Sequence, residues 1–219
     1  MKYCCKNILD QELQDEHKII KAKIEAFLNN PSEILAKYVN NQNHDIIAQI
    51  IAYHKLGDSK KSLELFTNLS NYDNLYIQEL KGQILYEAGF PKESVKIFAK
   101  LIKSLPQEIL IKIQFAGSVI SANDSSKYQL AIDELNKALI IEKENIMAWD
   151  FLAKLYHANQ NKLMSFYALA EASLLKGEHD LSIKYAQKAQ DLVTDDTNHI
   201  ITLKIKELME INNLKLKEK

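Results

Sequence analysis

A short residue pattern repeats along the chain and limits the folds that the chain can adopt. Gly57, Ser62 and Phe66 are followed 32 residues later by Gly89, Ser94 and Phe98. Weaker copies contain Ala131, Leu135 and Ala138, and then Ala170, Gly177, Ser182, Ala186 and Ala189. Between these points, apolar residues recur at helical spacing and the breaks are short. A period of about 34 residues, with two helices in each period, is typical of a helical solenoid.

The composition agrees with an all-α protein that has a sizeable core. The chain has 219 residues, of which 47% are hydrophobic and 26% are charged, so it is not a disordered sequence. Only 5 Gly and 3 Pro occur, whereas all-β proteins need both residue types in their many turns. We therefore expect a right-handed superhelical solenoid of about 12 helices arranged as antiparallel pairs.

Charge and hydropathy exclude several classes of partner. The formal net charge is -1 and there is no Arg, which disfavours nucleic-acid binding. Because no stretch of 18 apolar residues occurs, we expect no membrane span. Cys4 and Cys5 are adjacent and give no disulfide framework. The start of the chain is too polar for a signal peptide, so the chain as it stands is expected in the cytoplasm.

The helical periods divide the chain into three segments. Residues 1–42 are predicted to be an N-terminal helical extension that packs on the solenoid, with one helix at about 8–28 and a short one after Pro31. The first of these helices carries a stripe formed by Leu9, Leu13, His17, Ile20, Ile24 and Phe27. Residues 43–194 are predicted to hold the repeats, and residues 195–219 a capping helix with a polar tail.

One segment carries the signature of a known repeat. Trp149, Leu152, Ala153 and Tyr156 resemble the first-helix signature of the tetratricopeptide repeat, and the pairs 62/66 and 94/98 resemble its second-helix signature. Small residues at these positions let two helices approach closely, and the larger residue one turn later fills the gap. The resemblance covers about residues 43–192 and implies a scaffold that binds protein or peptide partners.

Two segments resemble a more specific family. Residues 79–89 and 149–175 are similar to the C-terminal repeat domain of BepA-like periplasmic zinc metallopeptidases. That family carries H-E-x-x-H in its protease domain, and none of the six His of this chain begins such a motif. The resemblance therefore implies a recognition domain without its protease, and it offers the periplasm as the alternative compartment.

The sequence contains no recognisable catalytic or cofactor-binding arrangement. No two His have the i, i+4 spacing of a helical zinc site, and no Gly-rich phosphate loop or G-x-S-x-G elbow occurs. His54 and His157 are the residues to consider as metal ligands, and a surface or groove-lining position is the simpler interpretation of each. We expect no enzyme activity, no metal and no cofactor.

A peptide-binding groove is expected where the first helices of the repeats line the concave side. The resemblance to the tetratricopeptide repeat implies that this groove is formed by Ile47, Ile51, His54, Tyr76, Glu79, Gln83, Tyr86, Glu87, Asp150, Lys154 and His157. The predicted function is a non-catalytic scaffold for protein–protein interaction. For the tyrosines of the groove, the simpler interpretation is that they pack between helices. The alternatives are an accessory or recognition subunit of an envelope protease encoded on a separate chain, and a vestigial repeat domain.

Overall fold

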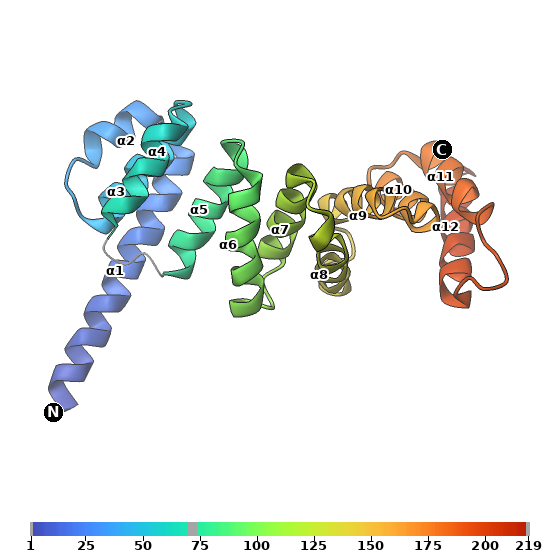
Figure 1. Ribbon diagram of the computed structural model, residues 1–219, viewed down its shortest axis with the longest axis horizontal. Coiled ribbons are helices and arrows are strands. Elements are labelled where there is room, and N and C mark those ends of the chain that lie inside the picture. The colour runs from blue at the N-terminus through green and yellow to red at the C-terminus, as the bar shows by residue number, and fades with distance from the viewer. Residues whose placement is uncertain (1, 70–73, 218–219) are drawn as a thin grey trace. The chain divides into compact units, whose positions relative to one another are not determined.

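The computed structural model describes the backbone of residues 2–69 and 74–217, and the side chains of residues 13–69 and 74–216. Within these ranges it holds twelve α-helices, two short 3-10 helices and no strand (Figure 1). The α-helices are α1 Lys2–Leu28, α2 Pro31–Lys37, α3 Asn43–Lys55, α4 Ser59–Leu65, α5 Leu75–Glu87, α6 Pro91–Ser104, α7 Ile109–Ala122, α8 Tyr128–Ile141, α9 Ile146–Ala158, α10 Lys162–Leu175, α11 His179–Gln190 and α12 His199–Lys217. The 3-10 helices are η1 Phe66–Asn68 and η2 Ser125–Lys127. The predicted all-α fold and the predicted number of helices are confirmed.

The chain divides into two compact units, unit 1 (Met1–Phe90) and unit 2 (Pro91–Lys219). The division falls in the loop between α5 and α6, inside the segment 43–194 that we predicted to hold the repeats. Each unit is described by itself below. The 3-10 helix η2 lies directly before α8.

Five helices end in the same way, which explains the regular spacing of the breaks. After α3, the Gly57 N–H donates to the His54 carbonyl at 2.9 Å and the Asp58 N–H to the Tyr53 carbonyl at 2.9 Å. This is the Schellman arrangement, which requires a positive φ at its turning residue. The same pair of bonds follows α5, α7, α9 and α10, with turning residues Gly89, Asn123, Gln160 and Gly177.

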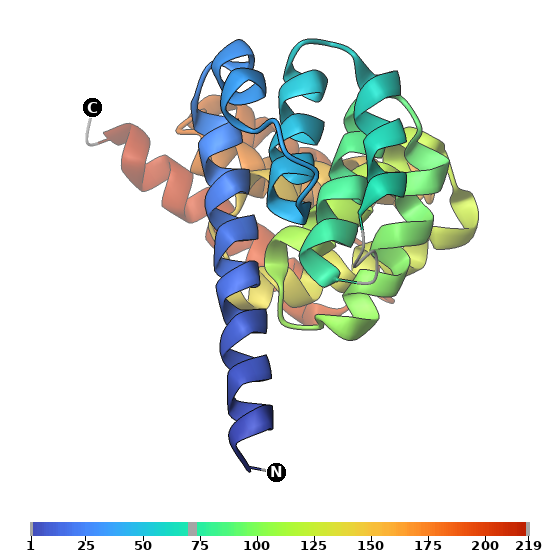
Figure 2. The ribbon, with the colours of Figure 1, turned by 90° about the vertical axis from the view of Figure 1, so that its left-hand side faces the viewer.

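The core of unit 1 is built around α3. Ile46, Ile47, Ile50 and Ile51 of α3 are buried, together with Ile77, Leu80 and Ile84 of α5 and Phe66 of η1. From α1, one face contributes Ile19, Ala22 and Ala26. The N-terminal turns of α1 extend past the ends of α2, α3 and α4 of the same unit (Figures 1 and 2). The helix begins at Lys2, earlier than the predicted position of about residue 8, because no Gly or Pro occurs before Pro31 to stop it.

Unit 2 contains two apolar clusters. The larger one spans α6 to α10, and Phe98, Phe115, Leu135 and Leu152 are fully buried in it. The smaller one joins α10 and α11 to α12 through small and branched residues, namely Ala170, Ala186, Ala189, Ile205 and Leu208. Thus α12 packs on the last helix pair and covers apolar residues of α10 and α11.

Three small serines at contacts between neighbouring helices also form hydrogen bonds, and two of them, Ser62 and Ser182, belong to the repeated pattern. The hydroxyls of Ser62, Ser165 and Ser182 each donate to a carbonyl 12 residues earlier, at 2.8, 2.9 and 2.7 Å. The acceptors are Ile50, Ala153 and Ala170, on the preceding helix in each case. A serine at this position therefore allows two helices to approach closely and also ties them together.

Candidate functional site

The predicted groove residues fall in both units, eight in unit 1 and three in unit 2. In unit 1, Ile47 and Ile51 are 1% and 0% exposed, so their side chains lie in the core and do not reach the surface. The six others carry side chains that are at least partly accessible: His54, Tyr76, Glu79, Gln83, Tyr86 and Glu87. The resemblance to the tetratricopeptide repeat assigned both isoleucines to the groove, whereas the structure places them on the core-facing side of α3.

Four residues of α5 form a stripe that we call the α5 stripe: Tyr76, Glu79, Gln83 and Tyr86. Their separations of three, four and three residues place them on one face of the helix. Tyr76 is 50% exposed and Tyr86 is 37% exposed, whereas Ile77, Leu80 and Ile84 on the other side are buried. The stripe therefore presents two aromatic side chains to solvent, with polar groups between them.

Hydrogen bonds fix the polar groups at the C-terminal end of the α5 stripe. His54 Nε2, from α3, lies 2.6 Å from Glu87 Oε2, and the Gln83 amide donates to Glu87 Oε1 at 2.9 Å. Glu87 thus holds side chains from two helices in defined positions. Its carboxylate oxygens still have lone pairs for one more donor, because each accepts one of these bonds.

The remaining acid of the stripe is part of an ion pair inside unit 1. Glu79 Oε2 accepts a hydrogen bond from Lys23 Nζ of α1 at 3.0 Å, and both side chains are mostly buried. This pair connects α1 to α5. It also neutralises Glu79, so the carboxylate of Glu87 is the stronger acceptor for a ligand on this face.

The three predicted residues of unit 2 lie on one face of α9, at spacings of four and three. Asp150 accepts two hydrogen bonds from Lys176, at 2.8 and 3.0 Å, and Lys154 Nζ lies 5.7 Å from the centre of the Phe151 ring. His157 lines a hollow of about 320 Å³ together with Phe166, Lys188 and Leu192. The two charged residues are therefore engaged within the unit, and His157 is the member that borders an open hollow.

Unit 2 also has a larger hollow that the sequence did not predict. It measures about 670 Å³ and lies between α8, α9, α10 and α12, with Trp149, Tyr167, Glu171, Leu174, Lys204 and Glu207 among its lining residues. The rings of Trp149 and Tyr167 meet edge to face, with centroids 5.8 Å apart. The Trp149 indole N–H donates to the Lys143 carbonyl at 2.9 Å, which fixes the ring.

The Tyr167 hydroxyl donates a short hydrogen bond to Glu171 in this hollow. Burial raises the pKa of the Glu171 carboxyl above its ordinary value, although the bond from Tyr167 acts in the opposite direction. Burial and the charge of Glu171 together raise the pKa of the Tyr167 hydroxyl. The spacing of four residues between Tyr167 and Glu171 was visible in the sequence, but the helices that close the hollow around them are distant along the chain.

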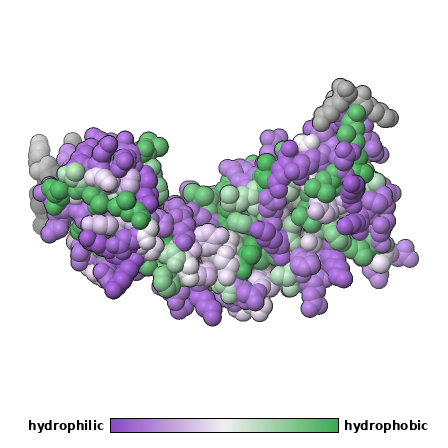
Figure 3. Space-filling model, turned by 90° about the horizontal axis from the view of Figure 1, so that it is seen from above, coloured by the Kyte–Doolittle hydropathy of each residue, from purple (hydrophilic) through white to green (hydrophobic). Residues whose placement is uncertain are grey.

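The described residues contain neither a metal-binding cluster nor a helix suited to cross a membrane. No group of three His, Cys, Asp or Glu side chains in residues 13–69 and 74–216 is placed so that it could hold a metal ion. In the same described part of the chain, no helix combines the length and the apolar character needed to cross a membrane. Figure 3 shows one face of the molecule, on which hydrophobic residues gather in patches between hydrophilic ones.

Comparison with known proteins identifies the fold. No protein-family model and no curated protein matches the sequence. Among solved structures, the chain is similar to a MamA RS-1 double mutant (TM-score 0.55, 15% identity, 80% of this chain and 96% of that chain). It is also similar to MamA from residue 41 to its end, from Desulfovibrio magneticus RS-1 (TM-score 0.53, 17% identity, 75% and 92%).

A tetratricopeptide repeat protein from Parabacteroides merdae aligns less well, with a TM-score of 0.46 and 13% identity over 91% of this chain and 80% of that chain. The two MamA matches, at 15% and 17% identity, identify the fold and leave the function open. The predicted kinship with BepA-like peptidases therefore stays a prediction. The chain has an all-α, tetratricopeptide-like fold of antiparallel helix pairs.

Proposed function

We propose that the chain is a non-catalytic scaffold for protein–protein interaction and that it binds a peptide segment of its partner on the α5 stripe. The observation that carries this proposal is the pair of half-exposed tyrosines, Tyr76 and Tyr86, on one face of α5 with hydrogen-bonding groups between and beside them. Tyrosine provides a large contact area at a small entropic cost. Tyrosine is enriched at protein interfaces because it combines an apolar ring with a polar hydroxyl.

The polar groups of this face indicate what kind of peptide it would accept. The carboxylate of Glu87 and the amide oxygen of Gln83 are acceptors, and the bond between the two side chains keeps them in place. A peptide would therefore place apolar side chains on Tyr76 and Tyr86 and donate backbone or side-chain hydrogen bonds to Glu87. Groups that are fixed before binding lose little entropy when the ligand arrives.

We infer that the chain has no catalytic activity of its own. The sequence lacks the motifs of metal-dependent, nucleotide-dependent and serine-nucleophile catalysis, and the described His side chains do not form clusters with other ligands. Glu171, whose pKa is raised, is hydrogen-bonded to Tyr167 rather than to a nucleophile. Structural networks also shift pKa values, so the raised pKa of Glu171 does not by itself indicate catalysis.

A second candidate function is the accessory or recognition subunit of an envelope protease encoded on another chain. The sequence resemblance of residues 79–89 favours it, since this segment includes Tyr86 and Glu87 of the proposed binding face. Copurification with a protease would support this version of the proposal. A vestigial domain would bind no specific peptide at any site.

The proposal is tested by measuring peptide affinity for matched variants. Peptides are selected from a random library on the wild-type protein, and their affinity is measured by fluorescence anisotropy. We expect Tyr86→Ala to weaken the selected peptide by about 1–3 kcal/mol, the range of interface hot spots. Lys100→Ala, an exposed position in unit 2, should change the affinity by less than about 0.5 kcal/mol. Equal affinities for wild type and Tyr86→Ala would rule out the α5 stripe as the binding face.

A further inference from the structure

The helix α1 has two apolar faces, and the structure uses only one of them. Ile19, Ala22 and Ala26 pack in the core of unit 1. The opposite face carries the residues that we call the α1 seam, which are Leu13, His17, Ile20, Ile24 and Phe27. All five are exposed, Leu13 at 62% and Ile24 at 53%. The stripe recognised in the sequence is therefore not the face by which the N-terminal extension packs.

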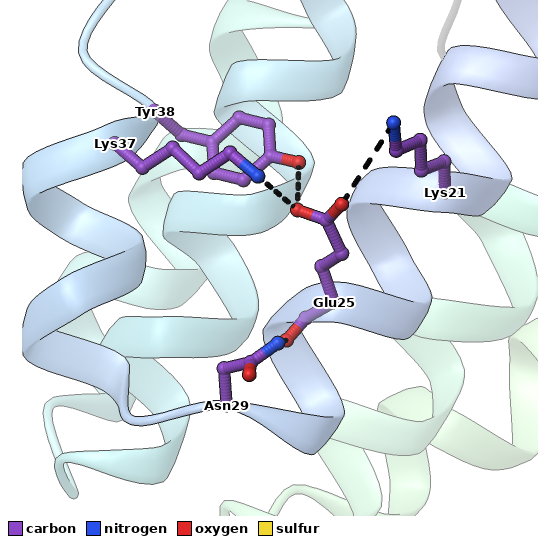
Figure 4. Close-up of polar contacts among 5 residues, drawn as sticks. All are labelled: Lys21, Glu25, Asn29, Lys37 and Tyr38. Atoms are coloured by element: carbon purple, nitrogen blue, oxygen red, sulfur yellow. Dashed lines mark hydrogen bonds and ion pairs between the residues drawn. The ribbon is translucent and has the colours of Figure 1, made fainter.

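Contacts within unit 1 hold α1 firmly, so the α1 seam has a fixed orientation. Glu25 accepts hydrogen bonds from the Tyr38 hydroxyl at 2.7 Å and from Lys37 Nζ at 2.5 Å (Figure 4). Lys55 Nζ donates to the carbonyls of Ala26, Phe27 and Asn29, the last at 2.7 Å, and thus caps the C-terminal end of the helix. A partner that binds the seam would meet a helix that is already formed.

The spacing of the α1 seam is that of a coiled coil. Its members follow one another at four, three, four and three residues, which is the a/d pattern of a heptad repeat. A globular helix normally has a broader apolar face. A shallow hollow of about 250 Å³ lies on the seam, lined by His17, Ile20, Lys21, Ile24 and Glu25. The first four of these residues have the i, i+3, i+4, i+7 arrangement of the hole that receives a knob in coiled-coil packing.

We propose that the α1 seam binds the same seam of a second copy of this chain, so that two α1 helices form a short parallel coiled coil. The charges beside the seam favour this occupant. With Leu13, Ile20 and Phe27 at d positions, Glu16 is a g residue and Lys21 is the e residue five positions later. In a parallel pair, a g residue lies beside that e residue of the other helix. The dimer would therefore have two Glu16–Lys21 pairs between copies.

The geometry of unit 1 leaves room for this arrangement. The seam lies on the side of α1 that faces away from the buried Ala22, so the body of unit 1 would lie outside the coiled coil in each copy. Lys21 is 4.0 Å from Glu25 in the single chain, at the limit of an ion pair, and its ammonium group can turn to Glu16 of the second copy. An antiparallel pair centred between Ile20 and Ile24 would instead set Lys21 against Lys21 of the second copy, which is repulsive.

The first test is the oligomeric state of the full chain in solution. Sedimentation equilibrium from micromolar to submillimolar concentration should show a reversible monomer–dimer equilibrium. The double variant Ile20→Ser/Ile24→Ser should raise the dimer dissociation constant by roughly tenfold or more, because each copy loses two apolar side chains from the interface. The control is Ile200→Ser/Leu203→Ser. These two exposed apolar residues lie on α12, three positions from each other. A wild-type monomer at every concentration would overturn the proposal, and so would a dimer that weakens equally in the control.

The second test uses charge exchange to determine the direction of the helices. Glu16→Lys and Lys21→Glu should each dimerise more weakly than the wild type, since each creates two like-charge pairs. A mixture of the two variants should form a heterodimer of near wild-type affinity, because the unlike pairs are then restored. If the seam variants weaken the dimer but the mixture gains nothing, the parallel arrangement is wrong. This inference does not rest on the proposed function, and peptide binding to the α5 stripe is measured separately.

Discussion

Asn212 is the residue whose replacement tests most sharply how α12 is attached. It is fully buried and joins three elements of unit 2. Its amide nitrogen donates to Ser182 Oγ at 2.9 Å and to the Leu208 carbonyl at 2.7 Å. The Ser182 hydroxyl in turn donates to the Ala170 carbonyl. With both amide protons used, the Asn212 carbonyl oxygen is the acceptor for His179 Nδ1–H at 3.0 Å.

The free-energy cost of Asn212→Ala follows from these contacts. Three hydrogen bonds are lost at about 1 kcal/mol each, and the buried His179 N–H keeps no partner. Alanine regains about 0.6 kcal/mol through its higher helix propensity. We therefore expect the free energy of unfolding to fall by about 2–3 kcal/mol. The matched control is Asn213→Ala on the same helix, where the side chain is exposed. This control should change stability only through the higher helix propensity of alanine.

The assay combines urea unfolding, followed by far-UV circular dichroism, with amide hydrogen exchange. Exchange is needed because helical repeats can open at one end before the whole chain unfolds. In Asn212→Ala, the amides of α11 and α12 should lose their protection from hydrogen exchange first, while the amides of unit 1 remain protected. If Asn212→Ala and Asn213→Ala have the same stability and the same exchange pattern, the buried network does not hold α12 and the reasoning is refuted.

Three further predictions concern turns, ionisation and metals. Gln160 has a φ of 60°, so Gln160→Gly should stabilise the protein by about 1 kcal/mol, whereas Gly177→Ala, at a φ of 77°, should destabilise it by a similar amount in urea unfolding. Burial raises the pKa of Glu171 in the folded state, so the folded protein holds this proton more tightly than the unfolded protein does. The stability that comes from protonated Glu171 is therefore present in acid and is lost as the pH rises through the raised pKa. Glu171→Gln, which keeps an acceptor for Tyr167, should therefore be more stable than the wild type at neutral pH and equal to it in acid, and the exposed Glu210→Gln should show no such difference. Chelation with EDTA should leave the melting temperature unchanged, and elemental analysis that finds one zinc per chain would contradict the reading of His54 and His157 as non-ligands.

The helix pairs could be predicted from the sequence because their signals are local. Apolar spacing, short breaks and turning residues such as Gly57 and Gly89 act within one or two helical turns, and the structure places the helices accordingly. The role of Ser62 was only half predicted. Its size suggested close helix approach, but its bond to the Ile50 carbonyl depends on the angle between two helices, which spacing does not encode.

The candidate sites were less predictable because they depend on which side of a helix is covered. Ile47 and Ile51 were expected in a groove and lie in the core, whereas the stripe containing Ile20 and Ile24 is exposed. Each of these helices carries apolar residues over much of its circumference, so periodicity allowed both orientations. The hollow beside Tyr167 was missed for another reason, since α8 and α12 approach it from distant parts of the chain.

The most direct test of the proposed function is the location of a bound peptide. Backbone amide chemical shifts of the full chain can be compared with and without the best peptide selected from a random library. We predict that the largest changes fall on α5, around Tyr76, Gln83 and Tyr86, and at the C-terminal end of α3 near His54. Changes confined to α1, or to the hollow between α8 and α12, would contradict the assignment of the α5 stripe as the binding face, and failure to select any specific peptide would contradict the proposed function itself.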